Sequence, residues 1–361
     1  MSSPLVSINV NNYNYARFLN QAIDSALNQT YPNIEVVVVD DGSQDSSQEI
    51  IGSYGNQIVP VLKENGGQAS AFNEGFRVSQ GEIVMFLDAD DYLLPDAAAQ
   101  VVSVWKSDTI QVQARLQLVD ANCNHIDIYP KPEIPFDSGD VSRLLLEKGR
   151  YRTTVTSGLS FRREALSKIL PIPEADFRIS ADGYLVTLVP FYGKVVSIDH
   201  PLGVRRYHGS NLWTLTGKSM TTEKLIKSVE HDLTKHKYLA KKANELGKTV
   251  SRELALKDYI HLINRIASLR LDPKNHPIPN DSQTLLAFKG YWAIWKYSKL
   301  SWTSKLVLSN WFIWVGLLPM FLAKPAIDWL VFRQSRPRPI DRFIKTLLRS
   351  TGQRRVFRNS S

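Results

Sequence analysis

The sequence predicts an α/β fold, in which a doubly wound, mostly parallel sheet is followed by a helical, partly amphipathic C-terminal region. Three observations lead to this prediction. Apolar, β-branched runs alternate with helical periodicities through roughly the first hundred residues. Each run ends in a polar segment, as expected where parallel strands present their carboxyl ends to a ligand. Beyond residue 211 the composition shifts to Lys, Glu, Leu and Ala, and then to tryptophan.

The composition sets the limits of this prediction. A chain of 361 residues is long enough for one large domain or for two. Its one cysteine, Cys123, excludes an internal disulfide framework, which fits a reducing compartment. The N-terminus from Met1 to Pro4 has no basic segment, so we expect no signal peptide. The formal net charge is +9, and the stretch from Lys324 to the end carries +8 of it.

The first two strands are expected at 5–10 and 34–39. A polar segment at 11–14 follows the first strand, and apolar residues at helical spacing then predict an amphipathic helix over 16–29. The second strand is β-branched and therefore suited to burial. Asp, Gly and Ser residues at 40–45 follow it, with the turn and N-cap chemistry that starts a further helix.

Two more strands complete the predicted parallel sheet. A short strand at 58–62 leads into the turn Asn65-Gly66-Gly67 and a helix near 68–79. The last strand, 83–88, begins with five consecutive apolar residues and suits burial on both faces of the sheet. Strands that alternate with helices in this way imply right-handed parallel crossovers.

Asp88, Asp90 and Asp91 come at the end of this strand, so three carboxylates lie within four residues. Carboxylates this close repel one another and raise each other's pKa unless a cation lies among them. Mg²⁺ or Mn²⁺ supplies such a charge, and its sites combine one or two carboxylates with substrate phosphates. We therefore predict a metal and diphosphate site at Asp88 and Asp90. The alternative is that Asp90 and Asp91 cap the helix after Pro95, with Asp88 solvated.

With a second acidic strand end at Asp40-Asp41, the chain resembles the family 2 glycosyltransferases with the GT-A fold. The resemblance covers roughly residues 4 to 211 and rests on three ordered segments, VSINVNNYNYARFLNQAIDSALNQTYPNIEVVVVDDGSQDSS, NGGQASAFNEG and GEIVMFLDADD. It implies an inverting transferase that takes a sugar from a nucleotide diphosphate donor, with Mn²⁺ or Mg²⁺ at the Asp-x-Asp motif. It also implies a nucleotide-sugar-binding half at 1–105 and an acceptor-binding half at 106–211.

The resemblance assigns the donor nucleotide to the ends of the first two strands. Asn12, Tyr13 and Asn14 would lie against the base and ribose. Asp41 would hydrogen-bond the base, for which uracil is expected, so a UDP-sugar is the favoured donor. The alternative for Asp41 is an N-cap of the helix after Ser43.

The resemblance also supplies the surroundings of the donor sugar. Asn65, Gly67 and Asn73 match the segment that supports this sugar. At the Asp-x-Asp motif, Asp90 would be the direct metal ligand, whereas Asp88 would face the ribose and the sugar.

An inverting transfer needs one base to take the proton from the acceptor hydroxyl. The family places this base in an acidic pair ahead of a helix, and here the pair is Ala181-Asp182. The first carboxylate is missing, so the resemblance leaves Asp182 as the base. The alternative is an N-cap role for Asp182 in a helix over 184–191.

The resemblance closes with Arg, His and Asn at a family spacing within 205–211. Arginine offers fixed N–H donors to phosphate oxygens, so Arg206 is a candidate contact for the donor diphosphate. His208 is a candidate for completing the metal shell, or for contacting the leaving diphosphate. The alternative for His208 is a structural hydrogen bond.

The region 212–361 is expected to be helical. Residues 221–271 predict one or two amphipathic helices, and the Pro-, Asn- and Asp-rich stretch 272–281 indicates a linker. Six tryptophans and one tyrosine follow: Tyr291, Trp292, Trp295, Trp302, Trp311, Trp314 and Trp329.

Within this region 306–323 is strongly apolar, but Asn310 and Pro319 interrupt it. A spanning helix needs about twenty apolar residues. Flanking tryptophans and a cationic tail favour an anchor on a membrane surface. A true span, or a helical cap buried on the catalytic domain or in an oligomer interface, is the alternative. We expect a location at the cytoplasmic face of the cell membrane and a saccharide or lipid-linked acceptor in polysaccharide biosynthesis.

Two other functions stay open at this point. A nucleotidyltransferase also binds a nucleotide and a cation, but it usually carries a Gly-rich, basic phosphate loop that 11–14 lacks. A catalytically degenerate homologue acting as a membrane scaffold would explain the missing acid at Ala181. We expect no nucleic-acid partner.

Overall fold

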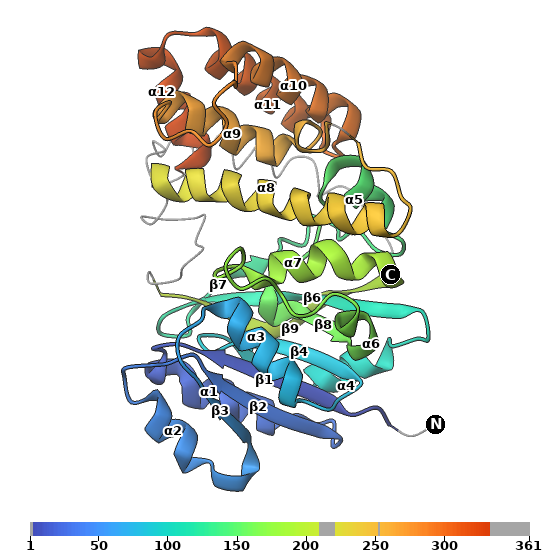
Figure 1. The fold of residues 1–361 in the computed structure, drawn as a ribbon. Helices are drawn as coiled ribbons and strands as arrows, with labels where there is room; N and C mark the ends of the chain where they lie inside the picture. Colours follow the sequence, from blue (N-terminus) through green and yellow to red (C-terminus); the bar gives the residue numbers. More distant parts are fainter. Residues whose placement is uncertain (1–2, 209–220, 252, 333–361) are drawn as a thin grey trace, which may run out of the picture. The chain divides into compact units, whose positions relative to one another are not determined.

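A computed structural model describes residues 3–208, 221–251 and 253–332 (Figure 1). The chain divides into two compact units. The first comprises Met1–Arg143 and Tyr151–Leu212, and the second comprises Leu144–Arg150 and Trp213–Ser361. The first unit holds the sheet and the second is helical, so the predicted α/β fold class with a helical C-terminal region is confirmed.

The first unit begins with four parallel strands in the order β3-β2-β1-β4. The elements of this half are β1 (Val6–Asn12), α1 (Ala16–Leu27), β2 (Ile34–Asp40), α2 (Ser47–Ser53), a 3₁₀ turn (Gly55–Gln57), β3 (Val59–Leu62), α3 (Gln68–Val78) and β4 (Ile83–Asp88). In the register of the sheet Asn11 pairs with Asp88, and Asn12 pairs with Asp40. The polar ends of three strands therefore lie at one edge.

Beyond β4 the sheet becomes mixed. β8 pairs antiparallel with both β4 and β6, β9 runs parallel to β6, and β5 and β7 add antiparallel edges. The elements are β5 (Tyr92–Leu93), α4 (Ala97–Ser103), β6 (Thr109–Asp120), β7 (His125–Tyr129), α5 (Ser142–Lys148), a 3₁₀ turn (Thr156–Gly158), β8 (Leu159–Arg162), α6 (Arg163–Ser167), α7 (Ala181–Leu188), a 3₁₀ turn (Val189–Tyr192) and β9 (Lys194–Tyr207). The assignment of functional halves at 1–105 and 106–211 stays a prediction.

Strand β2 shows why the sheet needs helices on both faces. Side chains alternate between the faces of a strand. Val36 and Val38 join the core that contains α1, whereas Val37 and Val39 pack with Ala71 of α3. A run of β-branched residues without polar alternation is thus buried on both sides, and only the strand ends are left for polar chemistry.

The second unit is a helical bundle of α8 (Thr222–Glu245), a 3₁₀ turn (Leu254–Leu256), α9 (Tyr259–Leu271), α10 (Gln283–Tyr297), α11 (Trp302–Leu317) and α12 (Met320–Val331). Thr221, Asp258, Ser282 and Ser301 start α8 to α11, and each side chain accepts a hydrogen bond from a backbone N–H of the first turn. Leu262, Ile294 and Phe312 are fully buried in the shared core.

The predicted apolar segment 306–323 is not one helix. α11 ends at Leu317, and Pro319 is the N-cap of α12. None of the described helices has the length and apolar character that a membrane crossing requires. Most of the predicted basic tail, from residue 333 onward, lies outside the described residues.

Candidate active site

The carboxyl ends of β1, β2 and β4 bring two asparagines beside two carboxylates. The Asn11 side chain donates to Asp88 (Nδ2 to Oδ1, 2.7 Å), and the Asn12 side chain donates to Asp40 at the same distance. Both asparagine Oδ1 atoms are buried, and neither makes a hydrogen bond. A polar ligand at this edge would find these acceptors already oriented.

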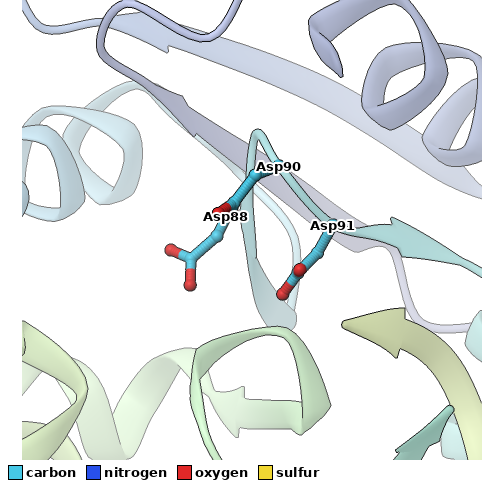
Figure 2. Close-up of side chains that lie close together, drawn as sticks. All are labelled: Asp88, Asp90 and Asp91. Carbon is cyan, nitrogen blue, oxygen red and sulfur yellow. The ribbon is translucent and has the colours of Figure 1, made fainter. Parts of the chain in front are cut away.

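Asp88, Asp90 and Asp91 form a triad at the turn after β4 (Figure 2). Each contributes a carboxylate oxygen, and these three oxygens all lie within 4.8 Å of one another. Asp90 and Asp91 are buried, and Asp88 is partly exposed. Burial, followed by the charge of Asp90, raises the pKa of Asp88 to about 7. The same two causes hold the pKa of Asp91 well above its usual range.

The triad fits a hard divalent cation. All three ligands are oxygens, which Mg²⁺ and Mn²⁺ prefer. Burial and then the charge of Asp90 raise the pKa values of Asp88 and Asp91, and a bound cation would offset both causes. The capping alternative is wrong, because α4 starts after Asp96, which is its N-cap. Asp91 was not among the predicted ligands, although its position in the sequence was sufficient to propose it.

His208 and Arg206 come from the end of β9 to the same turn. The His208 Nε2 atom lies 2.9 Å from Asp90 Oδ2, and its ring packs against Tyr15 and Phe18. Arg206 is 2% exposed, and its Nε atom donates to the backbone carbonyl of Asp90 at 3.0 Å. Its backbone N–H donates to Asp91 Oδ1 at 2.9 Å. In this geometry Arg206 holds the turn that carries the triad, and its contact with a donor stays a prediction.

Asp41 lies at the end of β2, where it organises a loop. Its carboxylate accepts from Lys63 Nζ at 2.7 Å and from the backbone N–H groups of Gly66 and Gly67 at 2.9 and 2.7 Å. Asn65 Nδ2 donates to it at 3.1 Å. The N-cap alternative is wrong, because α2 has Ser46 as its N-cap.

Of the residues predicted to bind the base, Asn12 ends β1, and Tyr13 and Asn14 form the tight turn after it. Asn12 is buried, whereas the Tyr13 side chain is 44% exposed. Asn14 has φ +58°, and its side chain accepts from the Gln44 backbone at 2.7 Å. This turn therefore presents the Tyr13 ring on a backbone that the next loop fixes.

The segment predicted to support the sugar meets the chain before α7. Gly67 has φ +89°, and a Cβ there would lie 2.4 Å from the Arg178 side chain, so only glycine fits. The Asn65 side chain accepts a hydrogen bond from Arg178. Asn73 pairs with the backbone of Ile172, accepting at 2.8 Å and donating at 3.0 Å. Here Asn65, Gly67 and Asn73 all position the chain around 172–178.

Asp182 lies in the first turn of α7, after Ser180 as N-cap, so the N-cap alternative is wrong for it too. Its charge contributes to the raised pKa of Asp88. Gln68 links the two regions, since it donates to Asp88 Oδ1 at 3.1 Å and accepts from the Ala181 backbone N–H at 2.9 Å. No sequence pattern indicated this bridge, beyond a polar residue at a helix start.

Proteins similar in sequence to this chain include several glycosyltransferases. The family model described as "Glycosyl transferase family 2" matches residues 7–170. An uncharacterized glycosyltransferase of Nostoc sp. is 39% identical over 229 residues, which cover 62% of this chain and 70% of that protein. An uncharacterized glycosyltransferase of Rickettsia typhi is 40% identical over 134 residues, 36% of this chain and 42% of that one. A chondroitin synthase of Pasteurella multocida is 45% identical over 97 residues, 26% of this chain and 10% of the synthase.

The solved structures that align with this chain have lower sequence identities. S. aureus TarS 1-349 in complex with UDP-GlcNAc is 16% identical with a TM-score of 0.47, covering 92% of this chain and 93% of that one. The mannosyltransferase PcManGT from Pyrobaculum calidifontis, in complex with GDP-Man and Mn²⁺, is 18% identical with a TM-score of 0.46, covering 92% and 85%. Similarity at this level carries no conclusion about this chain's ligands. The sequence match that covers 70% of the Nostoc glycosyltransferase, together with the family model, shows that this chain belongs to glycosyl transferase family 2.

Proposed function

We propose that this chain transfers a sugar, with inversion, from a nucleoside diphosphate donor to a hydroxyl of a saccharide or lipid-linked acceptor, and that Mn²⁺ or Mg²⁺ is required. The observation that carries the proposal is the triad of Asp88, Asp90 and Asp91 at the carboxyl edge of a parallel sheet. Since the chain belongs to a glycosyltransferase family, we do not retain the nucleotidyltransferase alternative.

For the donor we favour a UDP-sugar. The exposed Tyr13 ring offers a stacking surface beside Asn12 and Asn14. A base N–H would reach Asp41 by displacing one of its present donors. Lys63 is the donor best able to leave, because a lysine side chain reorients more easily than the two backbone N–H groups.

Asp90 and Asp88 would hold the cation, with Asp91 and His208 beside them. When bound, the cation would offset the negative charge that develops on the leaving diphosphate. Asp182 would accept the proton of the acceptor hydroxyl as that oxygen attacks the anomeric carbon. Gln68 positions this carboxylate relative to Asp88, through its bond to Ala181.

A catalytically degenerate homologue is the second candidate, because the position before Asp182 is alanine where the family has an acid. Asp182 by itself can still accept one proton, which is all that the inverting reaction requires. For this reason we favour the active enzyme. We place its reaction at the cytoplasmic face of the cell membrane, in polysaccharide biosynthesis.

Thermal unfolding with UDP, TDP, GDP or CMP, each with and without Mn²⁺, tests the donor site. A ligand at a hundred times its Kd adds about 2.7 kcal/mol of stability. We expect a shift with UDP that needs Mn²⁺ and that Asp90→Ala abolishes. Asp96→Asn, which removes a carboxylate at an exposed position after the same turn but keeps an N-cap residue for α4, is the control. No shift with any nucleotide would favour the degenerate homologue.

Release of UDP from a panel of UDP-sugars, with membrane extract as acceptor, tests the base. Asp182→Asn should keep the UDP shift and lower the transfer rate by roughly 10² to 10⁴, the usual contribution of a general base. Full transfer activity in both Asp90→Ala and Asp182→Asn would show that the site assignment is wrong.

A further inference from the structure

The helices α10 to α12 leave many large apolar side chains exposed. Among the described residues of these helices, twelve such side chains have exposed fractions between 37% and 74%: Leu285, Phe288, Tyr291, Trp292, Trp302, Leu306, Val307, Ile313, Trp314, Leu317, Phe321 and Leu322. We call them the aromatic face. Isolated exposed apolar residues are ordinary, but a gathering of this size marks an interaction surface.

The packing of α10 against α11 places part of the aromatic face on one side of this helix pair. The two helices run antiparallel, because Gly290 lies against Phe312 near their middles, while Trp295 and Trp302 meet with ring centroids 4.8 Å apart. Ala287 lies against Gly316 at the other end.

Four exposed residues, Phe288, Tyr291, Ile313 and Leu317, each follow a partner-facing residue by one position, an advance of about 100°. Phe288 follows Ala287 on α10, and Ile313 follows Phe312 on α11. In an antiparallel pair the same rotation on both helices turns both exposed faces to the same side. Leu317 and Phe321 are exposed on either side of the turn between α11 and α12, where Trp314 Nε1 donates to the backbone carbonyl of Leu322 at 3.1 Å.

The charges on α10 to α12 are mostly positive, although Lys289 pairs with Glu253 at 2.9 Å and Lys324 pairs with Asp328 at 2.7 Å. Residues 283–332 contain five lysines and one acidic residue, Asp328. Lys305 Nζ lies 5.6 Å from the centre of the Trp295 ring, and this ring contacts Trp302 of the aromatic face, so Lys305 lies near the edge of the face. The sequence after residue 332 adds nine basic residues against one acidic residue. An anionic partner complements this charge.

We propose that the aromatic face lies in the interface of an anionic lipid bilayer, with α10, α11 and the start of α12 parallel to the membrane plane. Tryptophan is enriched at this depth, where its ring is apolar and its N–H meets polar groups. Lysines beside the face would reach the lipid phosphates. Helices of 15, 16 and 12 residues are too short to cross a bilayer, but they suit this in-plane arrangement. The proposal does not depend on the sugar transfer.

Sedimentation of the full-length chain with lipid vesicles tests whether the aromatic face binds an anionic bilayer. We expect binding to vesicles of phosphatidylcholine with phosphatidylglycerol that is at least tenfold tighter than binding to phosphatidylcholine alone. Tryptophan emission should shift to the blue on binding and be quenched by brominated lipid chains. Binding that is equal for both vesicles, or absent from both, would overturn the proposal.

A triple variant identifies the surface. Phe288→Ser, Leu317→Ser and Phe321→Ser change side chains that are 58%, 63% and 74% exposed, one from each helix, so the fold should tolerate them. Burial of one such side chain is worth roughly tenfold in partitioning. We expect the triple variant to lose at least a hundredfold in vesicle binding.

The control variant carries Leu62→Ser and Ile126→Ser, at sites of 55% and 50% exposure in the first unit. It should bind vesicles as the parent chain does. The UDP and Mn²⁺ shift should survive in both variants, which separates failure of this proposal from failure of the donor site. Light scattering of the parent chain and the triple variant tests the alternative of a protein interface. If the parent chain is a dimer, the triple variant is a monomer, and neither binds vesicles, then the aromatic face is a protein interface and the proposal is wrong.

Discussion

Replacing Asp88 by asparagine should stabilise the metal-free protein at pH 8. In the folded state the pKa of Asp88 is about 7, against 3.8 for the free side chain, with burial as the main cause and the charge of Asp90 as the next. The folded state therefore binds the proton more tightly, and stability is lost as the pH rises from 3.8 through 7. The introduced amide would keep the oxygen acceptor that Asn11 and Gln68 use, without the charge.

The size of the expected stabilisation follows from the shift in the pKa of Asp88. Roughly three pKa units at 1.36 kcal/mol each give an upper limit of about 4 kcal/mol at pH 8. Asp88 is partly exposed, and its neighbours relax, so we expect about 2 kcal/mol. At pH 5 the gain should fall to roughly 40% of its value at pH 8, because folded Asp88 is then protonated and only the interval between pH 3.8 and 5 still contributes.

Amide hydrogen exchange of peptides covering β4, measured with EDTA present, reports this unit separately from the helical unit. Mn²⁺ should protect β4 in the parent protein and much less in Asp88→Asn, since the variant removes a ligand. Asp96→Asn, the same change at an exposed site, should alter neither result. A destabilised Asp88→Asn protein at pH 8, or equal gains at pH 5 and 8, would refute the electrostatic argument.

Three further predictions concern other parts of the molecule. Gln68→Leu removes the hydrogen-bond partner of the buried Ala181 N–H, so we expect the free energy of unfolding to fall by about 1–3 kcal/mol. The transfer rate should fall more than the affinity for the donor does. Separate measurements of kcat and KM would show this difference. Burial lowers the pKa of His236 to about 4 from 6.5, so the unfolded chain binds the extra proton between these values. Burial also lowers the pKa of His231, in the same helix, to about 3, so the helical unit should lose roughly 4 kcal/mol between pH 7 and 5, as followed by tryptophan fluorescence in urea. His236→Gln should remove about half of this loss. Gly290→Ala would place a Cβ 2.2 Å from the Phe312 ring and should lower the urea midpoint, corresponding to about 1–3 kcal/mol.

Local sequence pattern was enough to predict the four parallel strands β1 to β4 and their acidic edge, but not the mixed part of the sheet. Buried strands such as β2 and β4 are continuous apolar runs, and their ends are marked by an immediate change to Asp and Asn. These signals are local, because period and composition decide which residues a strand buries. Asp88, Asp90 and Asp91 were predictable as neighbours for the same reason. The family resemblance was carried by the same segments and is confirmed.

Which polar groups meet, by contrast, depends on the folded chain. Gln68 joins Asp88 to Ala181 across 113 residues of sequence, and Asp41 receives Lys63 from a later loop. Such pairs depend on how loops close over the sheet edge, which no periodicity records. The roles of Asp182 and Asp41 in the reaction stay predictions, although both prove not to be N-caps.

The same distinction holds for the helical unit. The tryptophan-rich sequence of α10 to α12 indicated an unusual surface, but it did not separate Phe312, which is fully buried, from Ile313, which is 44% exposed. Both are apolar and adjacent, so their sequence pattern is the same. The close contact of Gly290 with Phe312 decides which side of α11 faces α10 and, as a consequence, which side is left for a partner.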